Sequence, residues 1–419
     1  MNKSRIFAFA TSLILAAACH NTPAVRQIPE LLRTVPTDAL VVVPASSLED
    51  GLAMALDSTN VLRSLDWGRL GHNNAIISFV YNSKLSPIVC AEAGRSAADT
   101  LQDVKRILDE AAGSKVFAGY IPSGKCGTDR NILVVCQSEA VYSAAMRHLE
   151  AGKSVLDAPD FASALELAPE SNAIFIRNDG WDKILPKKYL SDIFKRSDVV
   201  KFAQGACDWT IVVPGNEGAG VRFSWHEGSP QFAGVLESLK GGESQLAAML
   251  PEDATFALDL PISSEFREAY RGWRYASSNL DKYEKELARL AKVSGVKPLE
   301  WEKTAGVREI GLVQWGKGRK VVLVRCTKQY ADSSEPVANE VAGFVPALYG
   351  SAFRAVADSC CIFRNGWMVC GAKDDVKAYA GVEPALEPAL QPKKNCKFAI
   401  WQPGRLFAAD SKGIYLTNE

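Results

Sequence analysis

The sequence predicts an α+β fold of two tandem related modules, each a mainly antiparallel sheet with helices packed on one face. Three observations support this prediction. Similar short segments recur in one order in both halves of the chain, most of them have a strand–turn–strand pattern, and helix-forming stretches separate them. The 419 residues are 47% hydrophobic, which suffices for packed cores, and a chain of this length usually forms more than one domain.

The N-terminus has the pattern of a bacterial lipoprotein signal. Lys3 and Arg5 precede a 13-residue, mainly apolar run at 6–18, which is shorter than the roughly 20 residues that span a bilayer. The run ends in "LAAAC", which resembles a lipobox, in which the cysteine receives a diacylglyceryl group and cleavage occurs before it. We therefore expect a signal peptide at 1–18, lipid on Cys19 and a tether at 19–34. A plain secretory signal with a chance cysteine is the alternative.

A strand that opens with Pro-x-Asp-Ala begins each predicted module. "VPTDALVVV" starts at Val35 and "LPEDATFALDL" at Leu250. Proline restricts the backbone, aspartate suits a turn, and the apolar run that follows predicts a buried strand. The first module is expected at 35–245 and the second, more divergent one at 246–419.

Further matches between the halves begin at residues 75 and 309, 113 and 350, and 171 and 395. The first two pairs read as two apolar strands around a polar turn, which predicts hairpins, and the third as a strand. The first copy continues with another hairpin over 207–225. The second copy is expected to end soon after a single strand in "KGIYLTN".

The second module carries one additional feature, a long amphipathic helix predicted over 263–294. Phe266, Tyr270, Trp273, Tyr283 and further apolar residues recur at intervals of three and four, which places them on one helical face. We expect this face to pack across its own sheet. The alternative is a docking surface for a protein partner, because the stripe is rich in aromatic residues.

A cross-strand disulfide is a candidate in "CCIFRNGWMVC". Asn365-Gly366 is a strong two-residue hairpin turn, and the resulting register places Cys361 opposite Cys370. Facing residues have Cα atoms about 4.5–5.5 Å apart, within the range of a disulfide. Two packed thiols are the equally open alternative.

The duplicated Pro-x-Asp-Ala strands together with Cys19 resemble lipoproteins of the Bacteroides group, whose modules open with such strands. The resemblance covers nearly all of the mature chain and implies a location and a duplication, but no activity. The resemblance implies glycosylation at Asp-Ser/Thr sites that are followed by an apolar residue or Thr, so "DST" and "DTL" make Ser58 and Thr100 candidate glycosylation sites.

Composition and motifs argue against several other functions. Removing Lys3 and Arg5 from 48 basic and 48 acidic residues leaves a net charge of about −2, which does not suit a nucleic-acid-binding protein. "GYIPSGKC" lacks the hydroxyl residue and the helix of a phosphate-binding loop. Asp160 is read as a helix cap rather than a catalytic acid paired with Asp157. The histidines show no zinc spacing, so neither a metal nor a cofactor is expected.

These observations favour a non-enzymatic binding or scaffolding protein whose ligand the sequence does not reveal. Lipid on Cys19 would hold it at the bacterial outer membrane, and the absence of acidic residues just after Cys19 favours the periplasmic side. One alternative is a surface glycan- or peptide-binding component of a nutrient-uptake system, because the chain has nine tryptophans. The other is a hydrolase with an unrecognised site. The expected partners are the membrane and a protein of the envelope.

Overall fold

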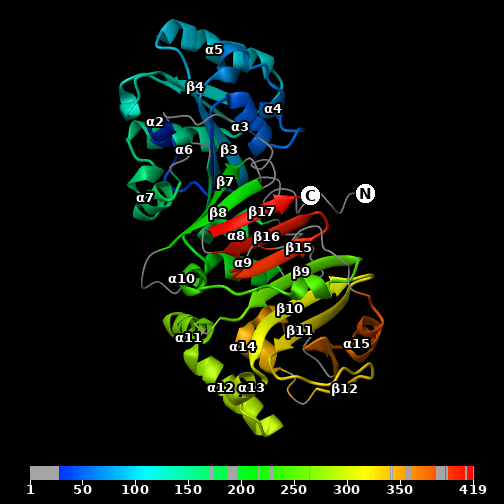
Figure 1. The fold of residues 1–419 in the computed structure, drawn as a ribbon. Coiled ribbons are helices and arrows are strands. Elements are labelled where there is room, and N and C mark those ends of the chain that lie inside the picture. Colours follow the sequence, from blue (N-terminus) through cyan, green and yellow to red (C-terminus); the bar gives the residue numbers. More distant parts are fainter. Residues whose placement is uncertain are drawn as a thin grey trace. The chain divides into compact units, whose positions relative to one another are not determined.

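The computed structural model (Figure 1) describes residues 28–168, 173–185, 196–215, 218–225, 231–263, 265–339, 341, 343–353, 360–383, 392, 395–410 and 413–418. The chain forms two compact units, Met1–His226 and Glu227–Glu419, here called module 1 and module 2. Residues 227–245 thus belong to the second unit rather than to the first copy of the repeat. The N–H of Gly242 ties this segment to module 2 by donating to the Cys396 carbonyl at 2.8 Å.

Module 1 contains one antiparallel sheet in the strand order β4-β5-β3-β2-β1-β6-β7-β8. The strands are β1 (Val41–Ala45), β2 (Ala75–Asn82), β3 (Lys84–Glu92), β4 (Phe117–Ile121), β5 (Ile132–Cys136), β6 (Ile174–Arg177), β7 (Trp209–Gly215) and β8 (Gly218–Ser224). The first strand therefore lies in the middle of the sheet, where it pairs with β2 and β6.

Helices cover both faces of this sheet, whereas the sequence analysis expected them on one. The helices are α2 (Ile28–Leu32), α3 (Leu48–Ala55), α4 (Val61–Ser64), α5 (Ala97–Glu110), α6 (Glu139–Glu150), α7 (Pro159–Glu166), α8 (Trp181–Ile184) and α9 (Arg196–Gln204). Val41 and Val43 join a core with α3 and α5, while Val42 joins a second core with α2, α6 and α7. Successive side chains point to opposite faces, so a strand as fully buried as β1 requires cover on both.

Module 2 repeats this strand order, with one short strand added at its edge. Its order is β12-β13-β14-β11-β10-β9-β15-β16-β17, all antiparallel. The strands are β9 (Ala254–Pro261), β10 (Val307–Trp315), β11 (Arg319–Cys326), β12 (Val337–Ala338), β13 (Cys360–Arg364), β14 (Trp367–Gly371), β15 (Phe398–Gln402), β16 (Arg405–Asp410) and β17 (Gly413–Asn418). The α+β class with two sheet-containing modules is therefore confirmed.

The Pro-x-Asp-Ala segments form the same turn in both modules. The N–H of Ala39 donates to the Pro36 carbonyl at 3.1 Å, and Ala254 donates to Pro251 at the same distance. Each turn leads into the central strand, β1 or β9. The predicted role of these residues as a turn before a strand is confirmed.

The C-terminus of module 2 differs from the sequence prediction of a single last strand. β16 and β17 form a complete hairpin, with Asp410 paired to Gly413. This hairpin occupies the position that β7 and β8 have in module 1. The prediction was wrong because the apolar run in "RLFAAD" is only four residues long and lies between two charged residues.

The predicted single helix over 263–294 is two helices, α11 (Phe266–Ala276) and α12 (Leu280–Ser294). The break falls at Ser277–Asn279, where Ser278 has a φ of 56°, a left-handed conformation that interrupts a right-handed helix. The remaining helices of module 2 are α10 (Phe232–Ser238), α13 (Pro298–Ala305), α14 (Phe344–Tyr349) and α15 (Lys373–Ala380).

Both faces of the module 2 sheet are also buried. Val321 and Leu323 of β11 share a core with Val376 and Tyr379 of α15. Val322 and Val324, which point to the opposite face, are also fully buried. We use "helical cap" for α11, α12, α13 and α14, which contact one another.

Candidate functional site

The helical cap of module 2 is held together by an ion pair between two half-buried side chains, Arg267 and Glu302. Arg267 Nε of α11 donates to Glu302 Oε2 of α13 at 3.0 Å, and its Nη1 donates to the Leu348 carbonyl of α14 at 2.9 Å. The hydroxyl of Tyr349 also donates to Glu302. Burial and the adjacent Glu302 raise the pKa of Tyr349 well above its usual value, so its hydroxyl keeps its proton. Three helices are thereby fixed to one another.

The aromatic stripe predicted from the sequence lies inside the cap. Phe266 stacks on Tyr270 at a centroid distance of 5.6 Å, and Tyr270 meets the ring of Tyr283 edge-on at 5.9 Å. The guanidinium of Arg274 lies 5.0 Å from the Tyr270 ring centroid and 5.3 Å from that of Trp273, within cation–π range. The stripe is therefore the core of a helical cluster, rather than a face packed across the sheet or an aromatic docking surface.

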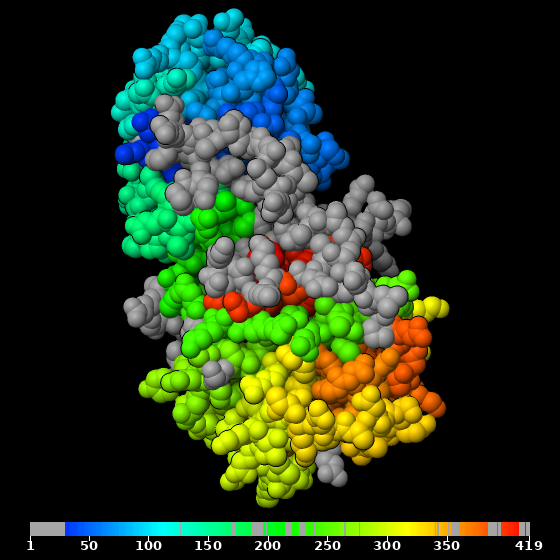
Figure 2. Space-filling model, viewed as in Figure 1, coloured from blue at the N-terminus to red at the C-terminus, as the bar shows by residue number. Residues whose placement is uncertain are grey.

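The other face of α12 is charged and exposed. Lys282, Lys285, Arg289 and Lys292, here called the basic stripe, are all exposed, and an exposed Val293 follows them. Val296 and Leu299, at the connection from α12 to α13, are exposed as well. Figure 2 shows α11 and α12 of the cap, coloured yellow-green, at the surface of module 2.

A second cluster of charged residues is buried in the sheet of module 2. Glu309 is the first residue of β10 that pairs with β9, and on the other side it lies directly opposite Arg325 of β11. Its Oε1 accepts hydrogen bonds from the N–H groups of Gln245 and Leu246, both at 2.8 Å, and its Oε2 lies 2.7 Å from Arg325 Nε. Asp259 of β9 lies next to Glu309 and, like it, is fully buried.

Burial sets the protonation of this cluster. Burial, together with the neighbouring Glu309 carboxylate, raises the pKa of Asp259 well above its usual value. Burial also raises the pKa of Glu309, although the two backbone N–H groups and Arg325 favour its charged form. The arrangement is therefore a protonated Asp259 beside an ionised Glu309, because two adjacent buried carboxylates do not both ionise readily.

Module 1 has a polar pair at the equivalent position. The pair Val41↔Phe79 in module 1 occupies the same position in the sheet as the pair Phe256↔Gln314 in module 2. Asn74 precedes Phe79 by five residues and Glu309 precedes Gln314 by five, so Asn74 is the counterpart of Glu309. Asn74 Nδ2 donates to Glu92 Oε2 at 3.2 Å, and burial raises the pKa of Glu92. Both modules thus place a polar cross-strand pair at this end of the sheet, with different residues in each.

The Glu309 carboxylate is tied to the backbone, and neither carboxyl group of the cluster is open to a substrate. Glu309 fixes the segment that leads into β9, and Arg325 Nη2 donates to the carbonyl of Glu243 in that segment at 3.1 Å. Neither Asp259 nor Glu309 has any exposed surface. The cluster acts as a structural anchor in this conformation.

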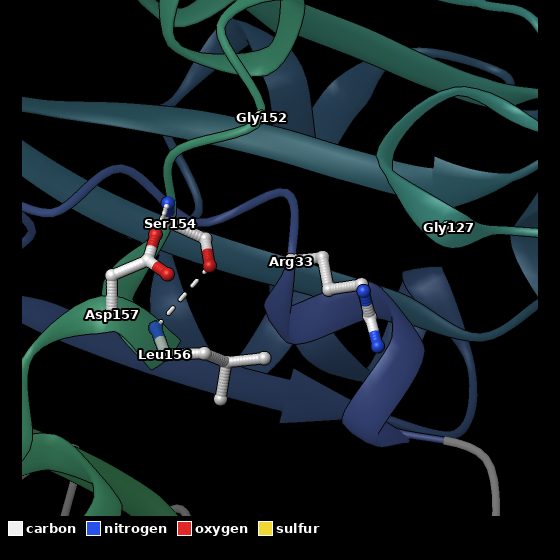
Figure 3. A pocket seen from close by; sticks show the side chains of 6 residues that line it. All are labelled: Arg33, Gly127, Gly152, Ser154, Leu156 and Asp157. Atoms are coloured by element: carbon white, nitrogen blue, oxygen red, sulfur yellow. Dashed lines mark hydrogen bonds between the residues drawn. The ribbon is translucent and has the colours of Figure 1, made fainter.

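A hollow of about 390 Å³ on module 1 is lined by Arg33, Gly127, Gly152, Ser154, Leu156 and Asp157 (Figure 3). The Ser154 hydroxyl accepts a hydrogen bond from the Leu156 N–H at 3.3 Å, and Asp157 Oδ2 accepts one from the Ser154 N–H at 2.8 Å. These side chains therefore cap a turn. Only exposed Arg33 remains to contact a ligand, which is too little to define a specific site.

The candidate modification sites fall in very different surroundings. Cys19 lies outside the described residues. Ser58 is exposed in a turn after α3. Thr100 is fully buried in α5, where its hydroxyl donates to the Ser96 carbonyl at 2.9 Å and accepts from Asn131 Nδ2 at 3.0 Å. A glycan on Thr100 would displace these bonds, so the fold argues against that position.

The hairpin register predicted for the cysteine pair is confirmed, with Cys361 directly opposite Cys370. Both residues are buried free thiols in the structure. Burial raises the pKa of each thiol, that of Cys370 well above its usual value. The disulfide itself stays a prediction.

Motifs that suggest other functions have structural explanations. "GYIPSGKC" runs from β4 into a short 3₁₀ helix and then β5, so it is a hairpin loop. Asp160 accepts a hydrogen bond from Trp209 Nε1 at 2.9 Å, and the N-terminus of α7 has no side-chain cap bond, so the predicted capping role of Asp160 is wrong.

All nine tryptophans lie in described segments, and each is buried or half-buried, which favours core packing over a glycan platform.

Within the described residues, no group of three or more His, Cys, Asp or Glu side chains is placed to hold a metal ion. No helix in the same segments has the length and apolar character to cross a membrane.

Comparison of the chain with models of known protein families, with curated proteins and with solved structures finds no match.

Neither the Glu309 cluster nor the Arg267–Glu302 pair was predicted from the sequence. Asp259 interrupts the apolar pattern "FALDL", and Glu309 directly precedes the apolar run "IGLV". A charged residue within a buried strand was the available signal. The bond from Arg267 to Glu302 had no such signal, because these residues lie on different helices and belong to an ordinary polar helix pattern.

Proposed function

We propose that this chain is a lipid-anchored protein of the bacterial outer membrane that faces the periplasm and acts as a non-enzymatic binding or scaffolding protein. The observation that carries the proposal is the lipobox-like "LAAAC", which would attach acyl chains such as palmitate to Cys19. Three acyl chains would give durable anchoring, because each buried CH₂ contributes about 0.8 kcal/mol.

The arrangement of charged side chains supports binding over catalysis. Glu309 is occupied by two backbone N–H groups and an arginine, and Glu302 by an arginine and a tyrosine. These groups stabilise the fold of module 2, and the Glu309 carboxylate has no exposed surface. The exposed parts of the helical cap offer a contact surface instead.

Membrane fractionation tests the location. The full-length protein is expected in the outer-membrane fraction, and a Cys19→Ala variant is expected to leave it, because it has no site for the acyl chains. Cys326→Ser, which changes a partly exposed thiol of module 2, serves as the matched control and should fractionate like the wild type. Wild-type protein in the soluble fraction would contradict the proposal.

Cross-linking in intact envelopes tests the scaffolding role. A defined partner is expected with the wild type and the Cys326→Ser control, and its yield should fall with Cys19→Ala, which no longer concentrates the body at the membrane. Turnover of a glycan or peptide by the purified protein would instead indicate an enzyme.

A further inference from the structure

The exposed face of α12 carries a line of positively charged side chains. Lys282, Lys285, Arg289 and Lys292 follow one another at intervals of three, four and three residues. At 3.6 residues per turn these side chains form one line along the helix. The opposite face is held in the cap by Tyr283 and Leu290, both buried.

Most of this positive charge is not used within module 2. Arg289 pairs with Glu286 of the same helix, with Nη2 and Oε1 2.9 Å apart. Among the described residues, Lys282, Lys285 and Lys292 take part in no ion pair. The nearby Glu284 is bound instead to Arg271 of α11, at 3.0 Å. Three lysines therefore remain available to an external anion.

An apolar tip continues the basic stripe. Val293 is 77% exposed, Val296 42% and Leu299 45%. Gly295, with a φ of 73°, ends α12 in a left-handed conformation and changes the direction of the chain. Val293 precedes this turn and Val296 follows it. Covering these exposed apolar side chains with another surface would be favourable, because it would remove them from water.

We propose that the basic stripe and the apolar tip dock module 2 on the anionic surface of a lipid bilayer. The lysines contact the phosphate groups of lipid headgroups, and the three apolar side chains of the tip enter the interfacial region. A helix with basic residues on its polar face and apolar residues at hand is typical of membrane-surface binding. The inference extends the proposed function, because a body tethered through Cys19 lies beside such a surface.

Binding to vesicles tests this inference without the acyl chains. The probe is the mature chain from residue 19 to 419 with Cys19→Ser, mixed with vesicles of phosphatidylglycerol and phosphatidylethanolamine or of phosphatidylcholine alone. We expect binding to the anionic vesicles only, and weakening as salt shortens the range of the electrostatic attraction. Because this chain carries no lipid, the result is independent of whether Cys19 is acylated in the cell.

Charge reversal locates the contact. The triple change Lys282→Glu, Lys285→Glu and Lys292→Glu is expected to lower the partition coefficient on anionic vesicles by more than about tenfold. The matched control reverses the same number of exposed lysines on module 1, at residues 105, 125 and 153, and should bind like the parent.

The apolar tip has its own variant. Val293→Ser with Leu299→Ser is expected to weaken binding by roughly tenfold, and to leave a residual affinity that high salt abolishes. The matched control, Leu101→Ser with Leu108→Ser, changes two exposed leucines of α5. Circular dichroism should show unchanged folding for every variant.

Three outcomes would overturn the inference. These are no binding of the parent chain to anionic vesicles, equal loss of binding in the module 1 control triple, and binding through the stripe to an acidic polypeptide but not to vesicles. Loss of Cys19 acylation alone would overturn only the proposed function.

Discussion

Replacing the buried Asp259 by asparagine should make module 2 more stable at neutral pH, by an amount that grows with pH. Asp259 has no exposed surface and lies beside Glu309, and both burial and that neighbour raise its pKa well above its usual value. The folded protein therefore keeps a proton on this carboxyl at pH values where the unfolded chain, with an aspartate pKa of about 3.9, has lost it.

The sign and size of the effect follow from this difference in bound protons. Below about pH 4 both states are protonated, so the site carries no penalty. As the pH rises towards the folded-state pKa, the unfolded state gains stability by about 1.4 kcal/mol per pH unit, because it alone releases the proton. Asparagine resembles the protonated carboxyl and does not titrate. The stability of Asp259→Asn relative to the wild type should therefore rise by the same slope.

Hydrogen exchange of the β9 and β10 peptides, measured by mass spectrometry between pH 4 and pH 8, reports the opening free energy of module 2 alone. The control is Asp253→Asn, which removes an exposed carboxylate of the same module and so separates the effect of the buried site from that of losing any one carboxylate. A pH-independent difference for Asp259→Asn, or a growing loss of stability, would refute the protonated assignment.

Three further expectations concern other sites. Glu302→Gln should destabilise the helical cap by about 3 kcal/mol, because it leaves a largely buried guanidinium without its counter-charge; faster exchange in α11 and α13 would show this, and unchanged exchange would not fit. Cys361 and Cys370 should be joined by a disulfide in protein isolated from the envelope, so alkylation of both without reductant would end that prediction. Glycoproteomics of envelope protein should find a glycan on Ser58 and none on Thr100, and a modified Thr100 would mean that this helix forms differently from the structure.

The sequence was most informative where local chemistry decides the structure. The two Pro-x-Asp-Ala segments correctly predicted a turn followed by a buried strand, because a turn and an apolar run are local features. Asn365-Gly366 gave the correct register of β13 and β14, since a two-residue turn fixes which residues face each other.

Other parts of the fold depend on contacts that the sequence does not display. The helical stripe over 263–294 kept its period across the break at Ser278, so periodicity alone suggested one helix. Helices cover both faces of each sheet because the central strands are buried on both sides. An apolar run in the sequence does not reveal this, because other buried elements have the same pattern. The equivalence of Asn74 and Glu309 was hidden because an amide and a carboxylate occupy the same structural position.

Intact-mass analysis of the protein extracted from its own membranes tests the central claim most directly. The account predicts a chain that begins at Cys19 and carries the added mass of a diacylglyceryl group and a third acyl chain. A chain that starts elsewhere, or a Cys19 of unmodified mass, would contradict it.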